Sequence, residues 1–173
     1  MLLEAVRWDD PRAAALRREM FDDVALLYPE SRDRVAAIGG YAAYDARGAA
    51  GLVAALLATA DGEPVGFVAV RRLPPDARPA GEDDVGGVDD VGELRRMYVR
   101  PAARGRGVAR ALLAAAEEAA TRAGLTRMVL ETGTAQVAAQ RLYRAAGYAD
   151  VPAYPPHVGD PTAVCLGKDL PGV

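Results

Sequence analysis

The segment of residues 93–109 constrains the fold more than any other, because it combines an expected strand, a glycine-rich turn and the start of a helix. Met97, Tyr98 and Val99 are apolar or β-forming residues. Pro101 cannot donate a hydrogen bond to a neighbouring strand, so the strand is expected to end before it. Arginine and glycine then alternate over residues 104–107, and an alanine-rich apolar segment follows at once. The pattern predicts a strand–turn–helix unit.

Such a turn can bind an anion. Gly105 and Gly107 let the backbone approach a ligand closely, and the first amides of the helix have no partner within the helix. Together with the helix dipole, these amides favour an anion, most often a phosphate. The alternative is a surface turn whose glycines and arginines serve only capping and solvation. Arginines are concentrated here in a chain whose net charge is −3, which favours a local anionic ligand over nucleic acid; they are Arg95, Arg96, Arg100, Arg104, Arg106 and Arg110.

The whole chain is expected to form one domain, residues 1–173, because its length is typical of a single core. Cys165 is the only cysteine, so an intrachain disulfide is excluded and the cytoplasm is the expected compartment. Met1 to Glu4 do not resemble a signal peptide, and the apolar run at residues 51–60 is too short to span a bilayer. A membrane partner is therefore not expected. His157 is the only histidine, so we expect no multi-histidine metal site and no metal cofactor.

The remaining pattern predicts an α/β fold. Strands are expected at residues 2–8, 51–60, 64–73, 126–132, 148–151 and 162–166, and helices at 12–28, from 31 to about 39, from 108 to about 124 and at 135–146. Asp61-Gly62 predicts a hairpin turn. Residues 74–91 form an acidic loop, whose carboxylates are either simply solvated or attract a cationic substrate. The strands flanking the glycine-rich unit are expected to be parallel.

Two motifs in this chain resemble the GNAT superfamily of N-acetyltransferases. The stretch ELRRMYVRPAARGRGVARALL is similar to the family's motif A, with Arg104, Gly107 and Ala109 at the characteristic positions. Residues 136–148, QVAAQRLYRAAGY, are similar to motif B, with a Leu-Tyr pair that ends in Tyr143. Both motifs occur in order, with an expected strand between them. The resemblance implies the GNAT fold: a mixed, mostly antiparallel central sheet, splayed at the acetyl-CoA site and flanked by helices.

The resemblance also implies acetyl-CoA as the acyl donor. The pyrophosphate would be bound by backbone amides of the turn and helix start, which here are those of Arg104, Gly105, Arg106, Gly107, Val108 and Ala109. The pantetheine arm would pair with the exposed backbone of Met97, Tyr98 and Val99. Gln136 stands where the family usually has asparagine, so its expected contact with the pantetheine is in doubt.

Two side chains are catalytic candidates under this resemblance. Glu93 stands where some members have a glutamate base, which would take a proton from the attacking amine. The alternative is that Glu93 pairs with an arginine or binds the substrate ammonium without transferring a proton. Tyr143 corresponds to the family tyrosine that protonates the leaving thiolate, and its alternative role is packing in the core.

The expected function is transfer of acetyl from acetyl-CoA to a primary amine of a small molecule, by direct attack in a ternary complex. A non-catalytic acetyl-CoA-sensing module on the same fold is one alternative, and an acetyltransferase for protein or peptide amino groups is another. A dinucleotide-binding enzyme is disfavoured because Arg110 occupies the third glycine position of that fingerprint. Homodimers are frequent in the family, and no residue of this sequence decides the oligomeric state.

Overall fold

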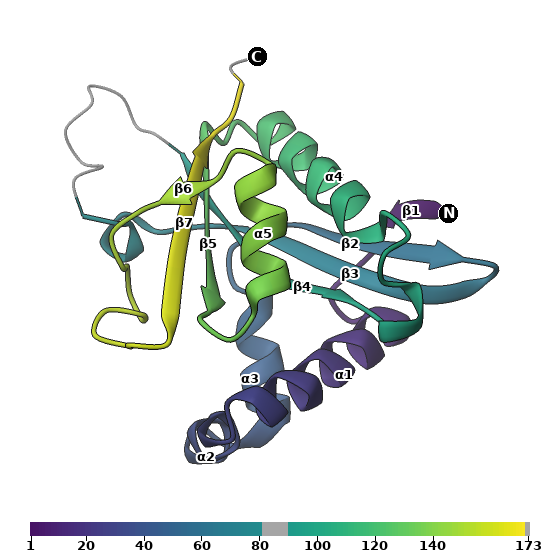
Figure 1. The fold of residues 1–173 in the computed structure, drawn as a ribbon, viewed down its shortest axis with the longest axis horizontal. Coiled ribbons are helices and arrows are strands. Elements are labelled where there is room, and N and C mark those ends of the chain that lie inside the picture. The colour runs from purple at the N-terminus through teal and green to yellow at the C-terminus, as the bar shows by residue number, and fades with distance from the viewer. Residues whose placement is uncertain (81–89, 172–173) are drawn as a thin grey trace.

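The computed structural model describes residues 1–80 and 90–171, which fold around one central sheet (Figure 1). The strands are β1 (Leu2–Ala5), β2 (Leu52–Ala60), β3 (Glu63–Arg72), β4 (Val91–Val99), β5 (Arg127–Gly133), β6 (Ala149–Asp150) and β7 (Ala163–Asp169). The helices are α1 (Pro11–Leu27), α2 (Glu30–Ala37), α3 (Gly40–Ala46), α4 (Val108–Arg122) and α5 (Val137–Ala145). The sheet order within these residues is β1-β2-β3-β4-β5-β7-β6.

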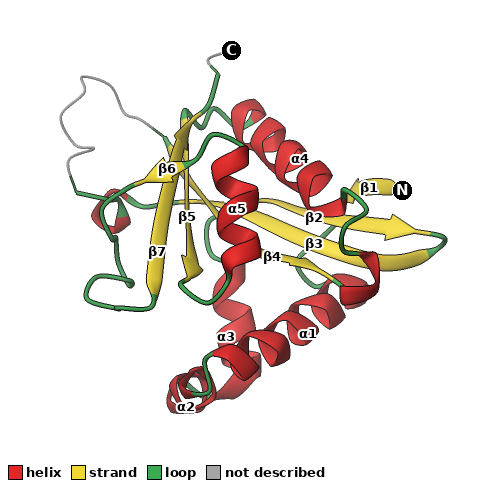
Figure 2. Cartoon of the chain, in the orientation of Figure 1, coloured by secondary structure: helices red, strands yellow, loops and turns green. Residues whose placement is uncertain are grey.

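The sheet is mixed and mostly antiparallel, as expected. Only β4 and β5 pair in parallel, and α4 connects them, so the predicted strand–helix–strand unit is present. Every other neighbouring pair of strands is antiparallel. Figure 2 shows α4 and α5 on one side of the sheet and α1 to α3 towards the other. We call these two sides the α4 face and the α1 face.

Local sequence signals set most of the boundaries. The side chain of Asp10 caps α1 by accepting a hydrogen bond of 2.8 Å from the Arg12 amide, and Pro11 occupies the first turn. Asp61 and Gly62 both have positive φ and form the tight turn between β2 and β3. The expected helices and the hairpin are therefore confirmed.

Three boundaries differ from the sequence expectation. The first strand ends at Ala5, because Trp8 turns towards the α1 face and packs edge-on against Phe67 at a centroid distance of 6.1 Å. The segment left unassigned around residue 44 forms α3. The last strand extends to Asp169, because its end pairs in register with the start of β5. These differences depend on partners that are distant in sequence.

The core fills both faces of the sheet. On the α4 face, α4 packs with the predicted stripe of Val108, Leu112, Leu113, Ala116 and Ala120, all of them buried. On the α1 face, buried residues of α1 pack on β2 to β4, and a further cluster with Tyr154 covers β5 and β7. Among the described helices, none combines the length and apolar character that crossing a bilayer requires.

Candidate active site

The site is organised by a fork between β4 and β5. The two strands pair from Val91↔Arg127 to Leu94↔Leu130, and then they diverge (Figure 1). Beyond Leu94, β4 still pairs with β3 on its other side, for example at Phe67↔Tyr98. The β5-facing backbone edge of residues 95–99 therefore has no strand partner within residues 1–80 and 90–171, which makes it a ready template for an extended ligand. The predicted contacts Met97, Tyr98 and Val99 lie on this edge.

A bulge in β4 produces the divergence. The register with β3 shifts between Phe67 and Ala69, and Arg96 has a φ of 57°, which is unusual for a residue with a side chain. As a result Arg95 and Arg96 both lie on the α1 face. The guanidinium of Arg96 stacks at 3.9 Å over the ring of Tyr44 in α3, and burial lowers its pKa. The stacking attaches α3 to the bulge.

The glycine-rich turn leads directly into α4. Gly105 and Gly107 have φ values of 75° and 83°, which favour glycine, and an added Cβ at either would meet open space. None of the amides of residues 105–109 donates to a backbone oxygen of the described residues. The exposed Arg104 donates a hydrogen bond of 3.0 Å from Nε to the Val99 carbonyl, which joins the turn to the end of β4. The turn therefore presents unpaired amides and two arginines, Arg104 and Arg106, to solvent.

Val108 and Ala109 could contribute to the expected anion site only through their amides. Their side chains pack into the core, where Val108 is fully enclosed. The helix N-terminus and the unpaired edge of β4 thus follow each other along the chain. A phosphate-bearing ligand with an extended arm fits this combination.

Tyr143 lies in α5 and is 5 % exposed. Its ring packs against Tyr148 at a centroid distance of 5.9 Å, and its hydroxyl makes no hydrogen bond to another described residue. Burial, followed by the negative charge of Glu131, raises the pKa of Tyr143 above its usual range. The hydroxyl therefore retains its proton at neutral pH.

Gln136 directly precedes α5. Its Oε1 accepts hydrogen bonds from the Gly133 amide at 2.8 Å and from the Thr132 hydroxyl at 3.1 Å. The side-chain oxygen thus stabilises the turn between β5 and α5. Its NH₂ group has no hydrogen-bond partner among the described residues and is the only part of the side chain left for a ligand.

Glu93 is 3 % exposed and surrounded by partners on the α1 face. Its carboxylate accepts from Arg71 Nε at 2.5 Å and from the Tyr154 hydroxyl at 3.1 Å, and Arg95 Nε lies 3.4 Å away. This environment corresponds to the arginine-paired alternative for Glu93. Glu93 could still affect a substrate indirectly, by orienting the side chain of Arg95, which is 27 % exposed.

Glu131, to which the sequence alone assigned no role, lies in β5 just past the fork. It is on the same face as Glu93, and its side chain is 30 % exposed. Burial, with additional repulsion from Asp160 and Glu93, raises the pKa of Glu131 to about 7. Its Oε2 lies 4.0 Å from His157 Nδ1, and burial lowers the pKa of His157. A single carboxylate inside the apolar run MVLET was the sequence signal for this residue.

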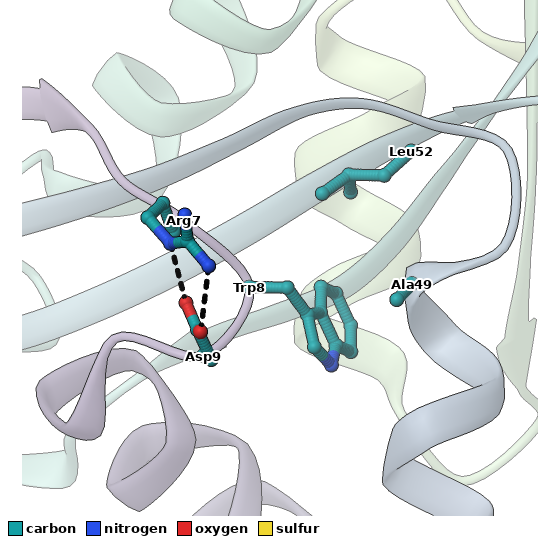
Figure 3. Close-up of a pocket in the computed structure, with 5 residues that line it drawn as sticks. All are labelled: Arg7, Trp8, Asp9, Ala49 and Leu52. Carbon is teal, nitrogen blue, oxygen red and sulfur yellow. Dashed lines mark hydrogen bonds and ion pairs between the residues drawn. The ribbon is translucent and has the colours of Figure 1, made fainter.

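A separate hollow lies beside β1 and the start of β2, with a volume of about 430 Å³. Its lining consists of Arg7, Trp8, Asp9, Ala49 and Leu52, and Figure 3 shows Arg7 and Asp9 joined as an ion pair on one side of the indole. Since β3 stands between β2 and β4 in the sheet, this hollow is not part of the fork.

Two expectations concern acidic groups and metals. Of the acidic loop, Glu82, Asp83, Asp84 and Asp89 lie outside the described residues. Asp90 is described and pairs with Arg72 at 2.5 Å. Within residues 1–80 and 90–171, no group of three or more His, Cys, Asp or Glu side chains is arranged to bind a metal ion.

Known proteins with similar structures share this architecture. A structure from Klebsiella pneumoniae described as an acyl-CoA N-acyltransferase superimposes with a TM-score of 0.68 and 25 % identity, over 98 % of this chain and 97 % of that one. The Salmonella typhimurium protein yncA, whose structure contains its cofactor acetyl-CoA, superimposes with a TM-score of 0.62 over 100 % and 95 % of the two chains. Its identity of 21 % supports a shared fold only.

Sequence comparisons identify relatives among characterised proteins. An aminoglycoside N(6′)-acetyltransferase type 1 of Stenotrophomonas maltophilia is 36 % identical over 70 % of this chain and 72 % of its own length. An IAA acetyltransferase of Azospirillum brasilense is 42 % identical over 46 % of this chain, and the match spans about half, 52 %, of that protein. The model of the acetyltransferase (GNAT) family matches residues 12–148, which include the fork, the glycine-rich turn and α5. The chain belongs to the GNAT family of acetyltransferases.

Proposed function

We propose that this protein transfers an acetyl group from acetyl-CoA to a primary amine of a small molecule by direct attack in a ternary complex. The observation that supports this most strongly is the loss of pairing on β4 after Leu94, next to a helix start with unpaired amides. Relatives named for acetylating an aminoglycoside and IAA support a small-molecule acceptor.

The residues present fit acetyl-CoA. The amides of residues 105–109 would bind its pyrophosphate, assisted by the exposed Arg104 and Arg106. The free backbone edge at Met97, Tyr98 and Val99 would pair with the pantetheine arm, and the Gln136 NH₂ group would donate to it. When bound, acetyl-CoA supplies an activated thioester carbonyl.

Proton transfer is assigned to two side chains near the fork. We assign the base to Glu131, because its pKa of about 7 and its partial exposure suit proton uptake from an ammonium at neutral pH. Glu93, the base expected from the sequence, is enclosed by Arg71, Arg95 and Tyr154 and is assigned a positioning role. Tyr143 donates a proton to sulfur as the amine nitrogen bonds to the acetyl carbon and the carbon–sulfur bond breaks.

The test of the function is release of CoA thiol from acetyl-CoA in the presence of a panel of amino acids, polyamines, aminoglycosides and short peptides. With an acceptor that the wild-type protein acetylates, the variant Tyr143→Phe should have a kcat about 10²-fold lower, since general acid catalysis typically contributes at least that much. Release with peptides alone would instead favour a protein acetyltransferase. If acetyl-CoA raises Tm but no acceptor releases thiol, the sensing module is favoured and the transferase proposal is overturned.

A negative charge at the glycine-rich turn should weaken the binding of acetyl-CoA. Gly107→Glu should weaken acetyl-CoA binding by at least about tenfold, because it places a carboxylate at the proposed pyrophosphate site. Calorimetric titration measures the effect. Gly124→Glu is the matched control: Gly124 has a φ of 77° and open space for a Cβ, but lies beyond the other end of α4. Equal losses in both variants would contradict the anion site, since backbone strain alone would then explain them.

A further inference from the structure

Two side chains of opposite charge face the mouth of the fork from its two strands. Leu94↔Leu130 is the last pair between β4 and β5, so Arg95 and Glu131 are the next residue on each strand. Parallel strands lie about 4.8 Å apart where they pair, and residues in register point to the same face. Arg95 and Glu131 are therefore neighbours across the opening of the fork, both on the α1 face. Their side chains are 27 % and 30 % exposed.

Arg95 and Glu131 do not form an ion pair with each other, and neither charge is fully neutralised by another described residue. They are not within ion-pair distance of each other, although both belong to the described residues. Glu93 is shared between Arg71 at 2.5 Å and Arg95 at 3.4 Å, so one positive charge of this trio is in excess. The Arg95 contact uses Nε, which leaves both Nη groups without a hydrogen-bond partner among the described residues.

Glu131 likewise has no close partner among the described residues that is charged at neutral pH, and the more distant Arg34 and Arg95 only partly offset the burial that raises its pKa. His157 lies 4.0 Å away, but its lowered pKa keeps it neutral at pH 7. Asp160, the other nearby carboxylate, is 3.7 Å from Arg34 of α2. The α1 side of the fork thus holds one excess positive charge, on Arg95, beside the carboxyl group of Glu131, which becomes negative as it loses its proton near pH 7.

We propose that the acceptor is a free amino acid, whose ammonium group binds at Glu131 and whose carboxylate binds at the Nη groups of Arg95. This inference rests on the proposed acetyl transfer. A guanidinium binds a carboxylate through two parallel hydrogen bonds, and a carboxylate accepts from an ammonium. Arg95 and Glu131 are adjacent in register at the mouth of the fork, which suits the short spacing of the two charges in an amino acid. A polycationic acceptor would meet the unneutralised Arg95, which separates this site from one built for aminoglycosides.

Matched pairs of acceptors test the inference. Phenylalanine and phenethylamine, arginine and agmatine, and alanine and ethylamine differ by one carboxylate each. For at least one pair, wild-type protein should show a kcat/KM for thiol release that is about 10- to 100-fold higher with the amino acid, as expected for a charged hydrogen-bonded contact. Arg95→Gln should bring the ratio within each preferred pair close to one.

The control is Arg32→Gln, which changes an exposed arginine of α2 that lies 3.7 Å from Asp22, outside the fork. It should leave the ratio as in wild type. Equal turnover of both members of every pair by wild type, or a ratio unaffected by Arg95→Gln, would overturn the amino-acid acceptor alone. An absence of thiol release with every amine, while acetyl-CoA still raises Tm, would overturn the transferase proposal and this inference with it.

Discussion

Replacing Glu131 with glutamine is expected to lower kcat by about 10²- to 10⁴-fold, the usual contribution of a general base. The variant keeps the size of the side chain but cannot take up a proton. In the wild type, kcat/KM should rise with pH through about 7, because the raised pKa of Glu131 keeps its carboxyl largely protonated, and inactive as a base, below that value. This ascending step should be absent in Glu131→Gln. Initial rates of thiol release across the pH range measure both effects.

Glu93→Gln is the matched comparison, because it removes the other carboxylate of the same face. Its loss leaves the half-buried Arg71 without its 2.5 Å partner, so a lower Tm is expected. The ascending step near pH 7 should nevertheless persist in the residual activity. If Glu93→Gln removes that step and Glu131→Gln does not, Glu93 is the base, as the motif resemblance implies.

Replacing Asp45 with alanine is expected to lower the free energy of unfolding by about 3–5 kcal/mol, because it leaves a buried charge without a partner. Arg17 of α1 is 1 % exposed, and its guanidinium lies 4.0 Å from the centroid of Trp8 and 5.3 Å from that of Phe67. Asp45 of α3 accepts two hydrogen bonds of 2.8 Å from it. Urea denaturation of the variant measures the change.

A double variant separates the lost charge pair from lost packing. Arg17→Met combined with Asp45→Ala keeps an apolar chain between the two rings and removes both charges. It should recover most of the stability lost in Asp45→Ala. A loss below about 1 kcal/mol in Asp45→Ala, or no recovery in the double variant, would contradict this account of the pair.

Much of the fold is local in origin and could be predicted. The Asp10-Pro11 start of α1, the Asp61-Gly62 turn and the apolar stripe of α4 each depend on neighbours in the chain. The glycine-rich turn is also a local feature, since the positive φ values of Gly105 and Gly107 favour glycine whatever the rest of the chain does. These signals and the two motifs are together sufficient to indicate the family.

The sequence by itself therefore determined most of the elements, the parallel strand–helix–strand unit and the glycine-rich turn. The tertiary structure decided which carboxylate at the fork is accessible. Glu93 and Glu131 each lie in a strand beside apolar residues, and the sequence does not show which of the two carboxylates stays accessible. Arg71 and Tyr154, which enclose Glu93, are 22 and 61 residues away in the chain, and the β4 bulge decides where the fork opens. Burial and charge pairing depend on such distant partners, so they become visible only in the folded chain.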